Sequence, residues 1–329
     1  MTPDDLQSAT ISHLLALSQG YRSARVLLTA LEVDVFSAIG GDRLSATEVA
    51  ERIGTDPRAT GILLNALVAL GLLEKATDGF ANPPPIRELL VAGAPNDARP
   101  GLRYAIDLWQ AWSHLTEIVR TGRPFAWEPG EAFPEQTARA MRLHALGLAS
   151  RLAETVDASR VSRMLDLGGG TGGHAIAFAR RYAGLQAVVF DRNARALAIA
   201  HEAIQRHGLL DRVSVRHGDV FTDDLGSGYD LVLVASLVCT FGEQQNRILL
   251  RTVAEALDEG GRVVVSDVLL DRSMTRPSSS SLFAVHMLVT TLNGRGYSAD
   301  EVADWLRDAG FRDIHFIPMR HTRLVIGTK

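Results

Sequence analysis

Apolar residues in the first third of the chain recur at the spacing of helices. Two runs show this pattern, Leu14 to Leu17 and Val26 to Val35, with apolar side chains returning after three or four positions. This spacing places the apolar side chains on one face of an α-helix. Residues 1 to about 95 are therefore predicted to form a helical unit.

Within this unit, residues 45–80 carry the signals of two short helices and a hairpin. Ser45 and Glu48 have the spacing of a capping box, which opens the first helix. Pro57 suits the first turn of the second helix. The segment Thr77-Asp78-Gly79-Phe80 is typical of a hairpin tip. Helix, turn, helix and a small wing together predict a winged helix.

A winged helix raises the possibility of DNA binding, so the charge of its second helix is informative. Between Pro57 and Leu73 the only charged residue is Arg58. A helix that reads DNA presents several Lys, Arg, Asn or Gln side chains to the groove. We therefore interpret this unit as a packing or dimerisation module.

The next segment, Leu102 to Arg120, is predicted to be one long helix. It carries Tyr104, Trp109 and Trp112. Tryptophans at this spacing pack in a core or form the wall of a pocket for a flat, apolar ligand. The sequence leaves both interpretations open.

After residue 160 the pattern changes to short β-rich runs that alternate with helical stretches. The runs cover 163–167, 187–191, 213–217, 230–235 and 261–266. The helical stretches between them cover 174–181, 194–207 and 243–257. This alternation predicts an α/β fold with a parallel sheet covered on both faces. Two final runs, at 315–318 and 324–326, are predicted to form a hairpin on the sheet edge.

Composition and charge narrow the class of protein. The 329 residues are 46% hydrophobic and 22% charged, the balance of an ordinary globular protein, with a net charge of −4. That charge disfavours nucleic acid as a partner, because nucleic-acid binding needs a concentrated positive field. Cys239 is the only cysteine and cannot form an internal disulfide. The N-terminus lacks the features of a signal peptide, and the most apolar stretch, Gly61 to Leu73, is too short to span a bilayer. We expect a cytoplasmic protein without a membrane partner.

A glycine-rich loop follows the first predicted strand and opens the first helix of the sheet. It reads Asp166-Leu-Gly-Gly-Gly-Thr-Gly-Gly173, with glycines at 168, 170 and 172. Glycines allow the backbone to approach a ligand closely at a helix N-terminus. The loop also satisfies the dinucleotide pattern G-x-G-x-x-G. The carboxylate of Asp166 argues against a pyrophosphate there and favours a ligand with a cationic group.

Aspartates also close the next two strands. Asp191 ends the second strand, where a carboxylate can accept both ribose hydroxyls. Asp219 follows the third strand and can accept from an adenine amino group, while Val220 or Phe221 packs on the base. Either aspartate alone is typical of a helix cap. Together with Asp166, at the ligand-binding edge of an open α/β sheet, they predict a nucleoside site.

These motifs, with Trp112–Gly122 and Met141–His144 upstream, resemble the class I S-adenosylmethionine-dependent methyltransferases of the small-molecule O-methyltransferase family. The resemblance covers nearly the whole chain. It implies a Rossmann-like catalytic domain at 161–329, a helical connector at 99–160 that contributes to the substrate pocket, and a winged-helix dimerisation domain at 1–98. It also implies a homodimer with interlocked N-terminal helices, a small-molecule acceptor, and no metal. The expected cofactor-binding residues are Asp166, Gly168, Gly170, Gly172, Asp191, Arg192, Asp219, Val220, Phe221 and Ser236.

The catalytic pattern of the family is incomplete in this chain. In the family register, Cys239 occupies the place of the histidine base and Gly296 that of its supporting acid. His286 and His144 are candidate replacement bases, and Cys239 is either a thiolate base or an apolar wall residue. The expected substrate-lining residues are Trp109, Trp112, Phe241 and Met287. O-methylation is the expected reaction; methylation of sulfur or nitrogen is the alternative, because those acceptors need no base, and a non-methylating enzyme or binding protein is more remote.

Overall fold

The computed structural model describes residues 3–94, 97–127, 147–320 and 322–329. The chain forms two compact units, Met1–Asp107 and Leu108–Lys329, which are described separately.

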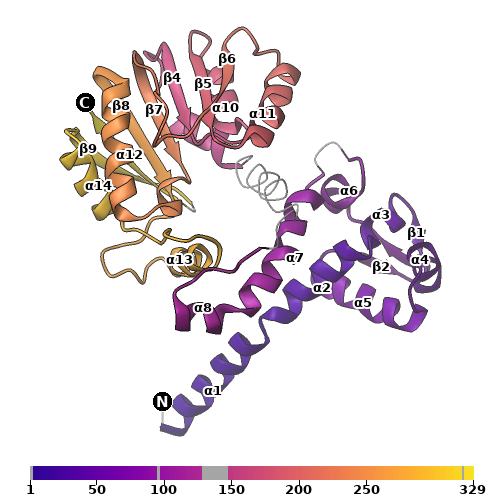
Figure 1. The fold of residues 1–329 in the computed structure, drawn as a ribbon. Coiled ribbons are helices and arrows are strands. Elements are labelled where there is room, and N and C mark those ends of the chain that lie inside the picture. The colour runs from indigo at the N-terminus through magenta and orange to yellow at the C-terminus, as the bar shows by residue number, and fades with distance from the viewer. Residues whose placement is uncertain (1–2, 95–96, 128–146, 321) are drawn as a thin grey trace. The chain divides into compact units, whose positions relative to one another are not determined.

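The first unit is mostly helical and contains one small antiparallel sheet (Figure 1). Its elements are α1 (Pro3–Gln19), α2 (Tyr21–Glu32), α3 (Val35–Ile39), β1 (Arg43–Leu44), α4 (Ala46–Ile53), α5 (Pro57–Ala69), β2 (Glu74–Ala76), β3 (Gly79–Ala81) and α6 (Pro84–Leu90). The strands lie in the order β1-β3-β2. The predicted winged-helix arrangement of α4, α5 and the β2–β3 hairpin is confirmed.

Polar side chains cap the starts of the two helices of this motif. Ser45 and Glu48 form the predicted capping box of α4, with each side chain bound to the backbone N–H of the other residue. Asp56 caps α5 by accepting from the Ala59 N–H at 2.7 Å. Because both helix starts are fixed locally, the apolar residues that follow, such as Leu64 and Leu67, face the core and are fully buried.

The single helix predicted at 102–120 is wrong, because the structure divides it into α7 (Arg99–Ser113) and α8 (Leu115–Thr121). The break lies at His114, whose ψ of 6° departs from helical geometry. Its Nδ1 lies 3.0 Å from the Gln110 carbonyl oxygen, and Ser113 Oγ donates to the Trp109 carbonyl. Side chains that bond these carbonyls compete with the helical hydrogen-bond pattern.

The second unit is built on a seven-stranded sheet with the order β6-β5-β4-β7-β8-β10-β9. Its elements are β4 (Arg163–Leu167), α10 (Gly173–Arg181), β5 (Gln186–Asp191), α11 (Ala194–Arg206), β6 (Val213–His217), β7 (Tyr229–Ala235), η1 (Val238–Thr240), α12 (Glu243–Ala256), β8 (Leu257–Asp267), α13 (Ser278–Thr290), α14 (Ala299–Asp308), β9 (Arg312–Pro318) and β10 (Arg323–Thr328). Strands β4 to β8 are parallel, and β10 and β9 add an antiparallel hairpin at the edge. The predicted α/β fold and edge hairpin are confirmed.

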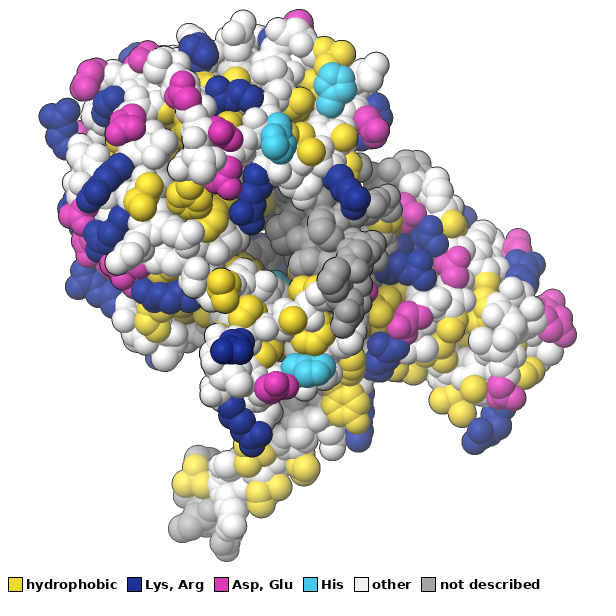
Figure 2. All heavy atoms as spheres, viewed as in Figure 1, with side chains coloured by type: hydrophobic (Ala, Val, Ile, Leu, Met, Phe, Trp, Pro, Cys, Tyr) yellow, Lys and Arg dark blue, Asp and Glu magenta, His cyan; other side chains and the backbone are white. Residues whose placement is uncertain are grey.

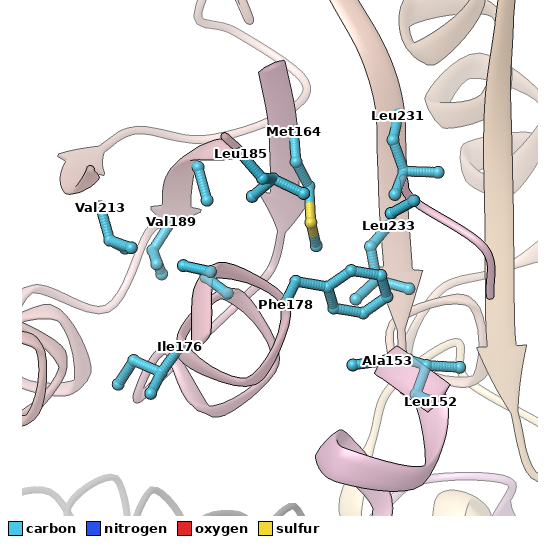
Figure 3. Close-up of a cluster of buried hydrophobic side chains, with 14 of the residues drawn as sticks. Leu152, Ala153, Met164, Ile176, Phe178, Leu185, Val189, Val213, Leu231 and Leu233 are labelled. Carbon is cyan, nitrogen blue, oxygen red and sulfur yellow. The ribbon is translucent and has the colours of Figure 1, made fainter. Parts of the chain in front are cut away.

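Two apolar cores cover the faces of this sheet, as the strand periodicity requires. Met164 belongs to one core with Phe178 of α10 and Leu152 of the helix at residues 147–155, as Figure 3 shows. The next residue, Leu165, belongs to the other core with helices α12 and α14. The sheet is thus held rigidly between two layers of helices, and the carboxyl ends of β4 to β8 share one edge.

No helix in the described part of the chain has the length and apolar character needed to cross a membrane.

Candidate active site

The glycine loop between β4 and α10 closely covers the side chain of Asp166, the last residue but one of β4. Gly168 and Gly172 have φ values of +70° and +75°, a region that favours glycine. At Gly169 an added Cβ would lie 2.7 Å from Cγ of Asp166. The loop therefore needs glycine both for its turns and for its close passage over the Asp166 carboxyl group.

Asp166 is completely buried beneath this loop. Its Oδ2 accepts from the Ala175 N–H in the first turn of α10, at 3.1 Å. Its Oδ1 has no hydrogen-bond partner among the described residues. Burial, together with the negative charge of Asp191, raises the pKa of Asp166 to about 7. A buried acceptor of this kind fits a ligand that carries a cationic donor, which is what the sequence predicted for this position.

Asp191 joins the end of β5 to the glycine loop. Its Oδ2 accepts from the Gly170 N–H at 2.9 Å, and its Oδ1 accepts from the Asn193 N–H at 2.8 Å. Asn193 in turn caps α11, while Arg192 is exposed beside it. Each carboxylate oxygen still has a second lone pair, so the half-buried Asp191 can also accept from ligand hydroxyls.

The segment after β6 is ordered by its own aspartate. Asp219 Oδ1 accepts from the Phe221 N–H at 2.9 Å, and the Asp219 N–H donates to Asp223 Oδ2 at 2.8 Å. Phe221 packs edge-on against Phe241, with ring centroids 4.9 Å apart. This turn places a polar group and an aromatic ring side by side, which is the combination predicted for a purine base.

At the end of β7, the strand turns into η1 through Ser236. Ser236 is exposed and has a φ of +52°, rare for a residue with a side chain. Its N–H donates to the Ser266 carbonyl of β8 at 2.8 Å. The strained backbone at Ser236 therefore turns the chain sharply just before Cys239, the expected position of the catalytic base.

Cys239 lies in η1 and is buried against the carboxyl group of Asp267, the last residue of β8. Asp267 Oδ2 accepts from the Cys239 N–H at 3.2 Å, and Asp267 is itself fully buried. Burial, followed by the neighbouring Asp267 carboxyl, raises the pKa of the Cys239 thiol well above its usual value. These surroundings favour the neutral thiol and match the apolar-wall interpretation of Cys239.

Asp267 was not identified from the sequence as a functional residue, although a signal existed. It ends β8 as Asp191 ends β5, while Asp166 is the last residue but one of β4. Its second oxygen, Oδ1, accepts from the Val268 N–H at 2.8 Å. Asp267 therefore holds the chain after β8 and the η1 turn together.

The Gly296 position has no room for the acid that the family pattern places there. An added Cβ at Gly296 would lie 2.6 Å from the Ala284 Cβ in α13. The following residue, Tyr297, donates its hydroxyl to the Phe241 carbonyl at 2.6 Å. This segment thus supports the backbone of η1 and its neighbour Phe241.

An aromatic cluster joins α7, α8 and α13 within the second unit. Trp112 stacks on His286 with centroids 6.5 Å apart, and Phe283 lies 5.7 Å from the same imidazole. Phe125 is anchored by a hydrogen bond from its N–H to the Val289 carbonyl and packs edge-on against Trp127. We call Trp112, Phe125, Trp127, Phe283 and His286 the aromatic cluster.

The other residues predicted for the acceptor site differ in their burial and in the helix on which they lie. Met287 is buried in α13, and Trp109 is half-buried in α7. His144 lies outside the described residues. Within the residues that the structure describes, no group of three or more His, Cys, Asp or Glu side chains could hold a metal ion.

Comparisons with known proteins give one consistent result. Residues 112–312 match the model of the O-methyltransferase domain, and residues 15–85 match that of the O-methyltransferase dimerisation domain. The chain is 34% identical to the 3-hydroxy-5-methyl-1-naphthoate 3-O-methyltransferase of Streptomyces sahachiroi, over 92% of this chain and 90% of that protein.

It is 33% identical to the tetracenomycin polyketide synthesis 8-O-methyl transferase of Streptomyces glaucescens, over 92% and 91% of the two chains. The fold is shared with human N-acetylserotonin methyltransferase, solved in complex with S-adenosylmethionine. For that pair the TM-score is 0.85 and the identity 24%, over 97% of each chain.

Proposed function

The chain belongs to the S-adenosylmethionine-dependent O-methyltransferase family, and from this premise we propose that it methylates an acidic hydroxyl group on a flat aromatic acceptor. The observation that carries this proposal is Cys239, a buried neutral thiol at the position of the family's base. The absence of a general base at position 239 supports an acidic hydroxyl group, and the aromatic cluster supports a flat acceptor.

The residues at the carboxyl ends of β4 to β6 fit the cofactor. Asp166 Oδ1, a buried acceptor without a partner among the residues that the structure describes, is offered to its ammonium group, and Asp191 offers lone pairs to the ribose hydroxyls. We assign Asp219 and Phe221, which are joined by the Phe221 N–H to Asp219 Oδ1 hydrogen bond, to the adenine. When bound, the cofactor supplies an electrophilic methyl group on a sulfonium, so the protein has to align the acceptor oxygen with that carbon.

The missing base limits which hydroxyls can react. A phenol with a pKa near 10 is only about 0.1% ionised at pH 7, which corresponds to roughly 4 kcal/mol. A positioned base recovers about 10²–10⁴ of rate. Because the buried Cys239 thiol is unsuited to this role, the favoured acceptor oxygen is one that ionises readily by itself. A hydroxyl acidified by an adjacent electron-withdrawing ring or carbonyl meets this requirement.

The aromatic cluster supports a flat acceptor. Trp112 and His286 present stacked rings, and Phe283 extends this surface along α13. Stacking on such rings favours planar apolar molecules. The two Streptomyces relatives carry names of O-methyltransferases that act on a hydroxynaphthoate and in tetracenomycin polyketide synthesis. We assign His286 to the acceptor wall, with a base role as the alternative.

The test measures S-adenosylhomocysteine release for hydroxylated aromatics of graded acidity between pH 6 and 9. We expect turnover to follow the ionised fraction of each acceptor. Cys239→His is expected to speed the least acidic phenol about 10-fold, while the control Cys239→Ala stays within about 3-fold of the wild type.

Two outcomes contradict the proposal. A titration with the same midpoint for every phenol indicates a base in the protein, and His286 or His144 is then examined first. Turnover of nitrogen or sulfur acceptors alone, without phenol turnover, supports the alternative reaction.

We also propose that the chain is a homodimer formed through its first unit. Helix α1 exposes five apolar side chains, about half or more accessible: Leu6, Ile11, Leu14, Leu15 and Leu17. Figure 2 shows hydrophobic side chains at the surface along this helix. A second copy is the occupant that the dimerisation-domain match supports. Light scattering is expected to give twice the chain mass, and Leu14→Glu with Leu17→Glu to shift it toward the monomer.

A further inference from the structure

His174, in the first turn of α10, is a buried polar group that the proposed mechanism does not use. It is 9% exposed, and its Nε2 has no hydrogen-bond partner in the described ranges of the chain. Burial lowers the pKa of His174 to about 4, so at neutral pH the ring is an uncharged imidazole with one N–H donor. A buried polar atom without a partner is destabilising, and it therefore requires an explanation.

The position of His174 gives that explanation. It follows the glycine loop directly, and the next residue, Ala175, donates its N–H to Asp166 Oδ2. Asp166 Oδ1 likewise has no partner within the described part of the molecule. The two buried polar atoms without partners, one on a carboxyl group and one on an imidazole, therefore belong to β4 and to the first turn of α10, which the Ala175–Asp166 hydrogen bond joins.

Helix geometry indicates where the imidazole leans. Residues four positions apart share one face of a helix, so His174 and Phe178 lie on the same side of α10. Phe178 points toward Leu152 and Ala153 of the preceding helix in Figure 3. Side chains on a helix lean toward its N-terminus, so the His174 ring is directed toward the glycine-loop end of α10.

We propose that His174 is a positioning residue for the amino-acid end of S-adenosylmethionine, with Nε2–H donating to the α-carboxylate while Asp166 Oδ1 accepts from the α-ammonium group. This assignment rests on the proposed cofactor site. The imidazole N–H is a donor that suits the carboxylate of a zwitterion, and the Asp166 oxygen is an acceptor that suits its ammonium group. The N-terminal end of the nine-residue α10 adds a favourable partial positive charge for the carboxylate.

The experiment compares two ligands that differ only at this end. S-adenosylhomocysteine keeps the amino acid, whereas 5′-methylthioadenosine keeps the nucleoside and sulfur without it. Calorimetry on the full chain is expected to show that His174→Phe weakens S-adenosylhomocysteine binding at least about 10-fold but changes 5′-methylthioadenosine binding less than about 2-fold. His174→Gln, which keeps a donor, is expected to retain most of the affinity for both.

The opposite outcomes are distinguishable. If His174→Phe leaves both affinities unchanged, or weakens both equally while the variant still unfolds cooperatively, the imidazole has only a packing role and the inference is overturned. The same holds if His174→Gln loses as much as His174→Phe. If the wild-type protein binds neither ligand, the cofactor site proposed above fails together with the inference.

Discussion

The proposed cofactor site and the proposed acceptor site of the second unit are formed by different kinds of groups. At the ends of β4 and β5, carboxylates and backbone N–H groups define the site: Asp191 holds Gly170 and Asn193, and Asp166 holds Ala175. Around α13, aromatic rings line the proposed acceptor site, and the acid beside the expected base position is the buried Asp267. A ligand that all members of a family share can be bound by a fixed set of carboxylates and backbone N–H groups. An acceptor that is particular to one enzyme is instead recognised by the side chains that surround it.

The largest effect that tests this contrast is expected for Asp191→Ala. The substitution removes two charge-assisted hydrogen bonds that hold the loop and the proposed acceptor for the ribose. We expect S-adenosylhomocysteine affinity to fall about 100-fold or more, as measured by calorimetry. Asp224→Ala is the control, because that exposed carboxylate only accepts from the Gly226 N–H. Unchanged affinity in Asp191→Ala places the nucleoside elsewhere.

A second prediction separates binding from stability at Asp166. Its pKa of about 7 lies above the usual value of 3.8, so the folded protein holds this proton to higher pH than the unfolded chain. Ligand-free stability is therefore lost progressively as pH rises from about 3.8 to about 7, by up to roughly 4 kcal/mol over that whole range. Asp166→Asn is expected to remove this loss and to weaken S-adenosylhomocysteine binding about 10-fold.

Thermal unfolding of both ligand-free proteins at pH 5.5 and pH 8 checks this prediction. The melting-temperature advantage of Asp166→Asn should be greater at pH 8. An advantage that is equal at the two pH values would show that the Asp166 carboxyl carries no such penalty.

The smallest effects are expected in the proposed acceptor site. Trp112→Ala and His286→Ala each remove one ring of the aromatic cluster, so KM for the aromatic acceptor should rise several-fold while kcat changes less. S-adenosylhomocysteine affinity should stay the same in both variants. If His286→Ala instead lowers kcat more than about 100-fold and abolishes its pH dependence, His286 is the base and the contrast between the two sites is weaker than described.

The sequence was sufficient where structure depends on local pattern. The strand ends at Leu167, Asp191 and His217 were predicted because apolar runs, turns and strand-end aspartates lie together in the chain. The helix break at His114 was missed because the apolar spacing continues on both sides of it. It depends on which carbonyl groups the neighbouring side chains bond, which the spacing does not encode.

Two polar residues, Asp267 and His174, were missed, and only one of them had a signal in the sequence. Asp267 could have been found, because it ends a strand as Asp191 does. His174 could not, since its burial results from its place in the first turn of α10 and from packing between segments that are distant in the sequence. The identity of the acceptor is equally non-local, because the rings that define it come from α7, α13 and the segment after α8.

The placement of α13 between β8 and α14 has a consequence for redesign. This helix lies in a connection and contributes no strand to the sheet, and its Phe283 and His286 are only half-buried. Its sequence can therefore vary without altering the frame that holds Asp166 and Asp191. A library confined to the exposed and half-buried positions of α13 is expected to yield variants with new acceptor preferences and an unchanged requirement for methyl donor.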